Sequence, residues 1–116
     1  MNETDKFAAV RKGLLEFAIL KIVSGARVYA ADIMERLAGA AFAAQEGTLY
    51  PLLSKLRRDE LLDYEWVESG AGPPRKYYQL TDKGAARLAE FEAYWRALND
   101  TLDRLGPQGR ADMGET

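Results

Sequence analysis

The sequence predicts a mainly α-helical protein with one small β-hairpin and a long C-terminal helix. Three observations support this fold class. Apolar residues recur at helical spacing in three stretches before residue 60, alternate with polar residues between 61 and 80, and form a heptad-like series after residue 81. With 116 residues and no internal repeat, the chain has the size of one compact domain.

The first two helices are predicted from apolar periodicity. Residues 10–23 are apolar on nearly all sides, which is typical of a helix that is buried on several faces. A short connection carrying Val28 and Tyr29 follows. A second helix is expected over roughly 31–38, and its inward positions at helical spacing are Ile33, Met34 and Leu37.

The third helical stretch, residues 46–59, has an apolar side and a polar side. One buried stripe with spacing i, i+3, i+4 and i+7 is formed by Leu49, Leu52, Leu53 and Leu56. Proline is tolerated in the first turn of a helix, so this helix is expected to begin near Gly47 or shortly before it. The outward positions, with Tyr50 at the margin, are Thr48, Pro51, Ser54, Lys55 and Arg58.

Two segments with period-two alternation predict a two-stranded β-hairpin. In residues 61–68, one side of the strand carries Leu62, Tyr64 and Trp66. In residues 75–80, Tyr78 and Leu80 share one face, and the other face carries Arg75, Tyr77 and Gln79. We expect Tyr78 to lie in the core and leave Tyr77 unassigned. The loop between the strands has its tip near Gly70–Pro73.

A long helix is predicted after Thr81, which is placed to cap it, with Asp82 in its positive first turn. Gly106-Pro107 ends the helix, and residues 106–116 are expected to form a flexible tail. Apolar residues recur along it at heptad spacing: Leu88, Phe91, Trp95, Leu98, Leu102 and Leu105. Because one small domain cannot cover so long an apolar stripe, these six residues predict a homodimer interface.

Composition excludes several classes of function. The chain has no cysteine and no histidine, so thiol nucleophiles, zinc fingers and Ser-His-Asp catalysis are excluded. No remaining groups form an evident nucleophile–base pair, so we predict that the protein is not an enzyme, and we expect neither a metal nor a cofactor. There is no long apolar run and no signal-peptide pattern at the start, which favours a cytoplasmic protein.

The predicted order of elements is that of a winged helix-turn-helix. In such a domain the second helix of the motif lies in the major groove of DNA, and the hairpin forms a wing beside it. Residues 46–59 have the required division into leucines on one side and hydroxyls and cations on the other. The candidate DNA-binding residues, on this helix and on the wing, are Thr48, Tyr50, Pro51, Ser54, Lys55, Arg57, Arg58, Arg75 and Lys76.

The stretches "GTLYPLLSKL" and "PRKYYQLT" resemble the PadR-type winged helix-turn-helix regulators, named for control of phenolic acid decarboxylase genes. The similarity extends over nearly all of residues 12–105. It implies a homodimeric transcriptional repressor that binds double-stranded DNA. Residues 1–80 would form the DNA-binding domain, residues 81–105 the dimerisation helix, and the first helix would contribute to the dimer.

The chain departs from the family pattern at three positions: Pro73 replaces a common arginine, and Glu60 and Ala30 replace common glycines. Without a glycine at 60, the left-handed end of the third helix must use another residue or be strained.

Aromatic residues of the long helix suggest a ligand site. Our hypothesis is that Phe91, Tyr94 and Trp95 line a cavity between protomers that binds a flat aromatic effector and relieves repression. Two alternatives remain open. Trp95 could be a structural anchor only, and the protein could be a winged-helix adaptor that binds another protein instead of DNA.

Overall fold

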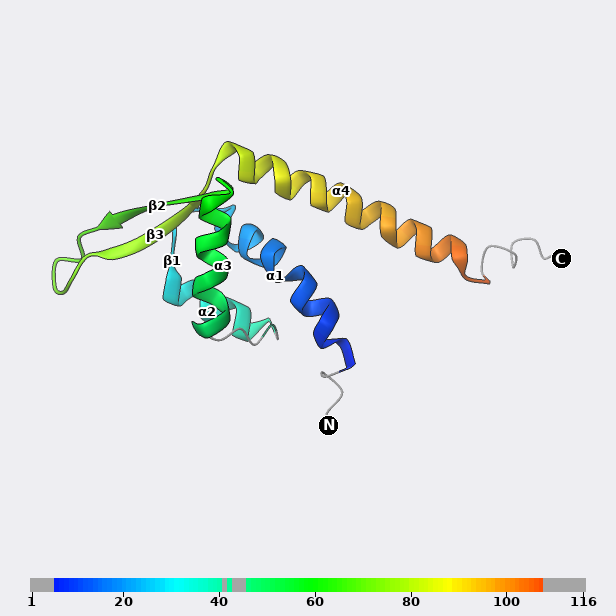
Figure 1. The fold of residues 1–116 in the computed structure, drawn as a ribbon, viewed down its shortest axis with the longest axis horizontal. Helices are drawn as coiled ribbons and strands as arrows, with labels where there is room; N and C mark the ends of the chain where they lie inside the picture. Colours follow the sequence, from blue (N-terminus) through cyan, green and yellow to red (C-terminus); the bar gives the residue numbers. More distant parts are fainter. Residues whose placement is uncertain (1–5, 41, 43–45, 108–116) are drawn as a thin grey trace.

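The computed structural model describes residues 6–40, 42 and 46–107. Figure 1 shows three short helices gathered around one end of a small sheet, from which a hairpin and a long helix project in opposite directions. In chain order the elements are α1 (Ala8–Val23), β1 (Val28–Tyr29), α2 (Ala30–Gly39), α3 (Glu46–Arg58), β2 (Leu62–Val67), β3 (Arg75–Leu80) and α4 (Asp82–Leu105).

The core lies where α1, α2 and α3 meet the base of the sheet. Helix α1 is buried on several sides, as its composition predicted, and α2 and α3 each contribute one apolar stripe. Leu52 is only partly buried, whereas the other three leucines of the α3 stripe are inaccessible to solvent. The side chains with least exposure are Ile19, Leu20, Ile33, Leu37, Leu49, Leu53, Leu56, Leu61 and Leu62.

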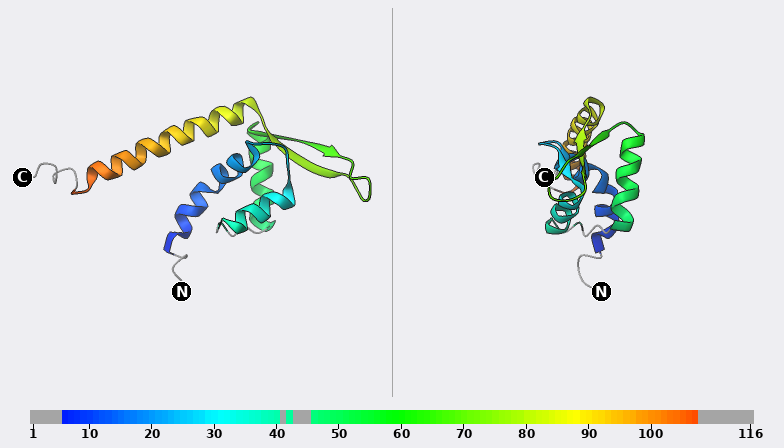
Figure 2. Two further views of the ribbon diagram at one scale, coloured as in Figure 1. Left: turned by 180° about the vertical axis from the view of Figure 1, so that it is seen from behind. Right: turned by 90° about the vertical axis from the view of Figure 1, so that its left-hand side faces the viewer.

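The sheet has three antiparallel strands, not the two that the sequence predicted, and their order is β1-β3-β2. Residues Val28 and Tyr29, expected to form a connection, pair with Tyr78 and Tyr77 of β3. A strand of two residues carries no detectable period, so this pairing depended on a partner far along the chain. Tyr78 is buried as predicted, whereas Trp66 is exposed because the hairpin extends beyond the helices (Figure 2).

Helix α3 begins at Glu46, within the expected range, but Pro51 lies beyond its first turn. Pro51 is the sixth residue of the helix, so it has no N–H to donate to the carbonyl of Gly47. The expectation that Pro51 occupies the first turn was therefore wrong.

Of the two ends that the sequence left open for α3, the structure has the strained one. Glu60 has a φ of 65°, the left-handed conformation that favours glycine. The Leu61 amide donates to the Leu56 carbonyl and the Glu60 amide donates to the Arg57 carbonyl, both at 2.9 Å. These two bonds form a Schellman motif with a glutamate in the usual glycine position.

Helix α4 starts as predicted and is fixed to this turn. The Thr81 side chain accepts a hydrogen bond from the Gly84 amide at 2.9 Å and lies 2.6 Å from the carbonyl oxygen of Glu60, to which it donates. The helix ends at Leu105, before Gly106-Pro107. Of the predicted flexible tail 106–116, residues 108–116 lie outside the described residues.

Candidate nucleic-acid interface

The outer face of α3 is open to solvent along its whole length. The leucines at 49, 53 and 56 anchor the helix in the core, which turns the opposite side outward. The exposed set contains every α3 residue that the sequence analysis assigned to DNA: Thr48, Tyr50, Pro51, Ser54, Lys55, Arg57 and Arg58. Thr48 and Tyr50 lie in the first half of the helix, and Ser54 and the three cations lie in the second.

Lys55 is the cation on this face whose charge is most compensated. Its ammonium lies 3.1 Å from a carboxylate oxygen of Asp59 and 3.4 Å from one of Glu16. A hydrogen bond to Asp59 and the charge of Glu16 raise the pKa of Lys55, and the same hydrogen bond lowers the pKa of Asp59. A phosphate would have to displace these carboxylates before it could bind Lys55 directly.

Arg57 lies closer to the wing. Its guanidinium carbon is 4.5 Å from the ring centre of Tyr64 on β2. This is a cation–π contact, which holds the guanidinium without cancelling its charge. Arg57 therefore remains positive at the junction between α3 and the wing.

The two wing cations point to opposite faces of the hairpin, because Arg75 and Lys76 are consecutive in a strand. The Lys76 ammonium is 4.2 Å from the ring centre of Tyr64 and 5.3 Å from that of Trp66. The Arg75 guanidinium is 4.6 Å from the ring centre of Tyr29, on the other face. Lys76 and Arg57 of α3 therefore lie against the same ring, that of Tyr64, whereas Arg75 lies against Tyr29 of β1.

Some of the acidic residues near these cations are paired within the chain. Glu65 lies on the Arg75 side of the wing and forms an ion pair of 2.5 Å with Arg27. Asp59 is engaged by Lys55. The face that carries Lys76 presents Tyr64 and Trp66 from β2, with no acidic residue between them on that side. This face of the wing is consequently the more positive one near α3.

The heptad stripe of α4 divides into a buried half and an open half. Leu88 is buried in the core of its own chain, and the Phe91 ring stacks on Phe17 of α1 with centres 3.7 Å apart. Beyond them the stripe is exposed: Trp95 by 38%, Leu102 by 56% and Leu105 by 76%. Within the residues that the structure describes, most of the far half of this apolar stripe is uncovered, and Leu98 is partly buried.

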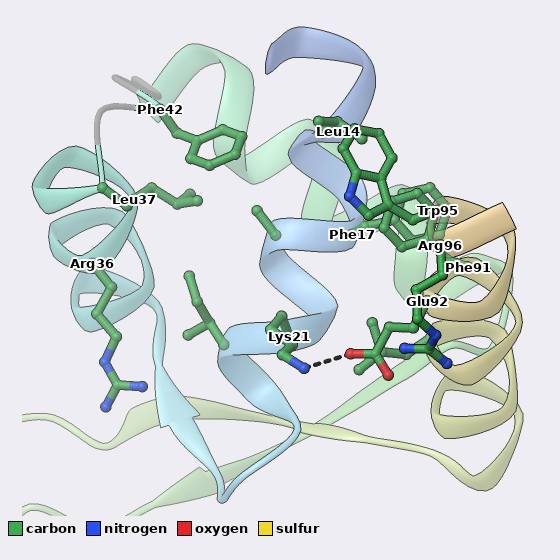
Figure 3. Close-up of a pocket in the computed structure, with 14 residues that line it drawn as sticks. Leu14, Phe17, Lys21, Arg36, Leu37, Phe42, Phe91, Glu92, Trp95 and Arg96 are labelled. Atoms are coloured by element: carbon green, nitrogen blue, oxygen red, sulfur yellow. Dashed lines mark hydrogen bonds and ion pairs between the residues drawn. The ribbon is translucent and has the colours of Figure 1, made fainter. Parts of the chain in front are cut away.

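A hollow of about 560 Å³ opens between α1, α2 and α4. Figure 3 shows Phe17, Phe91 and Trp95 on one side of it and Leu37 and Phe42 on the other, with the Lys21–Glu92 ion pair at its rim. Phe91 and Trp95, two of the predicted effector residues, line this hollow. Tyr94, the third, lines a shallower adjoining hollow of about 380 Å³, together with Phe91 and Trp95.

Two features of the structure were not predicted from the sequence. Tyr64 was assigned only to a strand face, although it contacts cations of both α3 and β3. Gly84 was not singled out, although a Cβ there would lie 2.0 Å from the Leu61 carbonyl oxygen. Period-two alternation could have placed Tyr64 and Lys76 on the same face of the hairpin. Nothing in the local sequence marks Gly84.

The family model described as the transcriptional regulator PadR-like family matches residues 19–90. The chain belongs to this family. PadR-like proteins are transcriptional regulators, so the protein is a regulator and not an enzyme. In the residues that the structure describes, none of the helices has the length and apolar character needed to cross a bilayer.

Solved structures of PadR-type regulators are similar to this chain in sequence and in fold. A PadR-like transcription factor from Bacteroides fragilis is 48% identical, with a TM-score of 0.76, over 88% of this chain and 99% of that one. A PadR family regulator from Eggerthella lenta is 33% identical, with a TM-score of 0.78, over 88% and 89%. Bacillus subtilis PadR in complex with operator DNA is 26% identical, with a TM-score of 0.62, over 67% of this chain and 45% of that one.

Proposed function

We propose that this PadR-like protein is a homodimeric repressor that binds double-stranded DNA in the cytoplasm. Helix α3, near residues 46–59, would enter the major groove, and the wing, near 62–80, would contact the backbone or the minor groove. The observation that carries this proposal is the division of α3. Three inaccessible leucines fix one side in the core, and all seven candidate contact residues on the other side are exposed.

The positions of the cations support the proposal. Arg57, Arg58 and Lys76 lie on α3 and on the adjoining face of the wing, where a backbone running beside α3 would pass. The net charge of the whole chain is −2, so binding depends on where the cations are placed and not on their number. Bacillus subtilis PadR, the relative solved with operator DNA, has the same fold over the matched region.

The proposed dimer forms through α4, with a contribution from α1. The apolar stripe from Trp95 to Leu105 is largely exposed in the described chain, although Leu98 is partly buried, and a second copy would cover it. A two-fold dimer would make two copies of each DNA contact, one from each protomer. It also requires a pseudo-palindromic operator whose half-sites are about one helical turn, roughly 34 Å, apart.

The proposed effector is a flat aromatic molecule that binds near Phe91, Tyr94 and Trp95 and relieves repression. Both hollows beside α4 are lined mainly by apolar side chains, and an aromatic ring could stack on Trp95. Fluorescence quenching tests this in a Trp66→Phe background, which leaves Trp95 as the only tryptophan. If no compound in a broad aromatic panel quenches Trp95, its role is structural.

The experiment that tests DNA binding is selection of bound duplexes from a genomic fragment library at physiological salt, followed by affinity measurements over a salt series. We expect recovery of a pseudo-palindromic sequence and a steep fall in affinity with added salt. Lys55→Ala or Arg75→Ala should weaken binding to every duplex, whereas substitution of Thr48 or Tyr50 should alter sequence preference. A protein that enriches no sequence and shows no salt-dependent DNA binding would instead be a protein-binding adaptor.

A further inference from the structure

Tyr64 lies between two cations that come from different parts of the interface. Arg57 of α3 is 4.5 Å from the centre of its ring, and Lys76 of β3 is 4.2 Å from it. The ring itself belongs to β2, where Tyr64 pairs in register with Tyr78. Three elements of the interface therefore meet at one side chain.

A tyrosine holds cations in a different way from a carboxylate. The Asp59 and Glu16 carboxylates compensate the charge of Lys55, but the neutral ring of Tyr64 leaves Arg57 and Lys76 fully charged. A guanidinium that lies over a ring keeps its in-plane N–H groups free for a phosphate. The contacts also offset the mutual repulsion of two neighbouring cations and restrict the rotamers of two long side chains before DNA arrives.

Burial of Tyr64 does not by itself explain the contacts. Leu62 and Tyr78 are nearly inaccessible at the base of the hairpin, whereas Tyr64 is only half-buried and packs against the edge of the core. Further out, Trp66 lies edge-on to Tyr64 with centres 6.3 Å apart and is 62% exposed. Tyr64 and Trp66 thus extend the aromatic surface beyond the core, to the part of the wing where both rings contact Lys76.

We propose that Tyr64 is a positioning residue that holds Arg57 of the recognition helix and Lys76 of the wing at a fixed separation, so that both cations meet the same stretch of DNA backbone. The proposal rests on the proposed DNA-binding function. It assigns no DNA contact to Tyr64 itself. The ring acts through the two cations. It lowers the conformational entropy of their side chains, and it carries no negative charge that would compensate theirs.

The test compares Tyr64→Leu, which keeps an apolar side chain, with Tyr64→Phe, which keeps the ring. On the selected duplex we expect Tyr64→Leu to bind on the order of tenfold more weakly, because two cation–π contacts are lost. The slope of log affinity against log salt should become shallower by up to about 1.8 per protomer, the share of two phosphate contacts. Tyr64→Phe should restore both the affinity and the slope. Urea unfolding of each variant reports any loss of fold separately.

A double-mutant cycle separates positioning from other roles. In an Arg57→Ala, Lys76→Ala background the ring has no cation to hold, so Tyr64→Leu should then change DNA affinity by less than about twofold. An equal loss in both backgrounds would mean that Tyr64 contacts DNA or supports the fold, and would overturn the proposal. So would a Tyr64→Leu variant with the affinity and salt slope of the parent.

A measurement on the unmodified protein keeps the proposal testable if Tyr64→Leu does not fold. The ring current of Tyr64 should shift the Arg57 Hδ and Lys76 Hε resonances upfield in the DNA-free protein. Random-coil shifts for both groups would overturn the proposal. Failure of the parent protein to bind any duplex would overturn the proposed function together with this inference, whereas parent binding with an unaffected Tyr64→Leu variant would overturn this inference alone.

Discussion

Gly84 of α4 lies against the backbone of Leu61, so Gly84→Ala should be strongly destabilising. An alanine Cβ would lie 2.0 Å from the carbonyl oxygen of Leu61 and 3.0 Å from the Leu80 Cδ1 atom. Cβ atoms essentially never approach another heavy atom within 3.0 Å. The obstructing atom belongs to the backbone, so a side-chain rotation cannot relieve the clash, and α4 must move.

The movement disrupts the bonds that hold the helix. The Leu61 carbonyl accepts from the Thr81 amide at 3.2 Å and lies 3.1 Å from the Thr81 hydroxyl. Overpacking costs about 1–3 kcal/mol and each weakened hydrogen bond about 1 kcal/mol, while the better helix propensity of alanine returns about 1 kcal/mol. With both hydrogen bonds weakened, we expect a net decrease of about 2–4 kcal/mol in the free energy of unfolding.

Urea unfolding followed by far-ultraviolet circular dichroism measures this at a fixed protomer concentration, because the proposed dimer would make stability depend on concentration. Gly39→Ala is the matched control. Gly39 is also helical, but a Cβ there meets nothing within 4 Å, so the control should retain or slightly gain stability. If Gly84→Ala were as stable as the control, the close approach of α4 to Leu61 would be refuted.

Two other substitutions test the end of α3. Glu60→Gly should raise the free energy of unfolding by about 0.5–1 kcal/mol in the same urea assay, because the φ of 65° is unstrained only for glycine. The exposed ion pair with Lys83 that is lost contributes little. Asp59→Asn should strengthen DNA binding on the order of threefold at low salt, because Lys55 loses its nearest carboxylate. A gain that persisted unchanged at high salt would contradict the electrostatic explanation.

The elements with dense periodic signals could be predicted from the sequence. The leucine stripe of α3 fixed which side of the helix is buried, and alternation around Tyr78 placed the hairpin and its buried face. Thr81 was predicted as a cap because a hydroxyl preceded a long helical pattern with Asp82 in its first turn. In each of these cases the cause is local, so neighbouring residues carry the information.

Features that arise from contacts between distant segments could not be predicted. The ion pair of Lys55 with Glu16 joins residues 39 apart, and β1 exists only because β3 lies beside it. Arg75 and Lys76 were both assigned to DNA, although the structure holds them against different rings, those of Tyr29 and Tyr64. Strain at Glu60 was one of two outcomes left open by the departure from the family pattern, whereas the contact at Gly84 depends on how α4 packs against the turn.

Helix α4 is a lever arm that pivots at the end of α3. Its 24 residues span about 36 Å at the usual helical rise. Rotation by about 5° at Thr81 therefore displaces the distal end by about 3 Å. In a dimer in which two copies of α4 pair, the angle between them would set the spacing and tilt of the two α3 helices. The hydrogen bonds from Thr81 to the Glu60 and Leu61 carbonyls would transmit a rotation of α4 to α3.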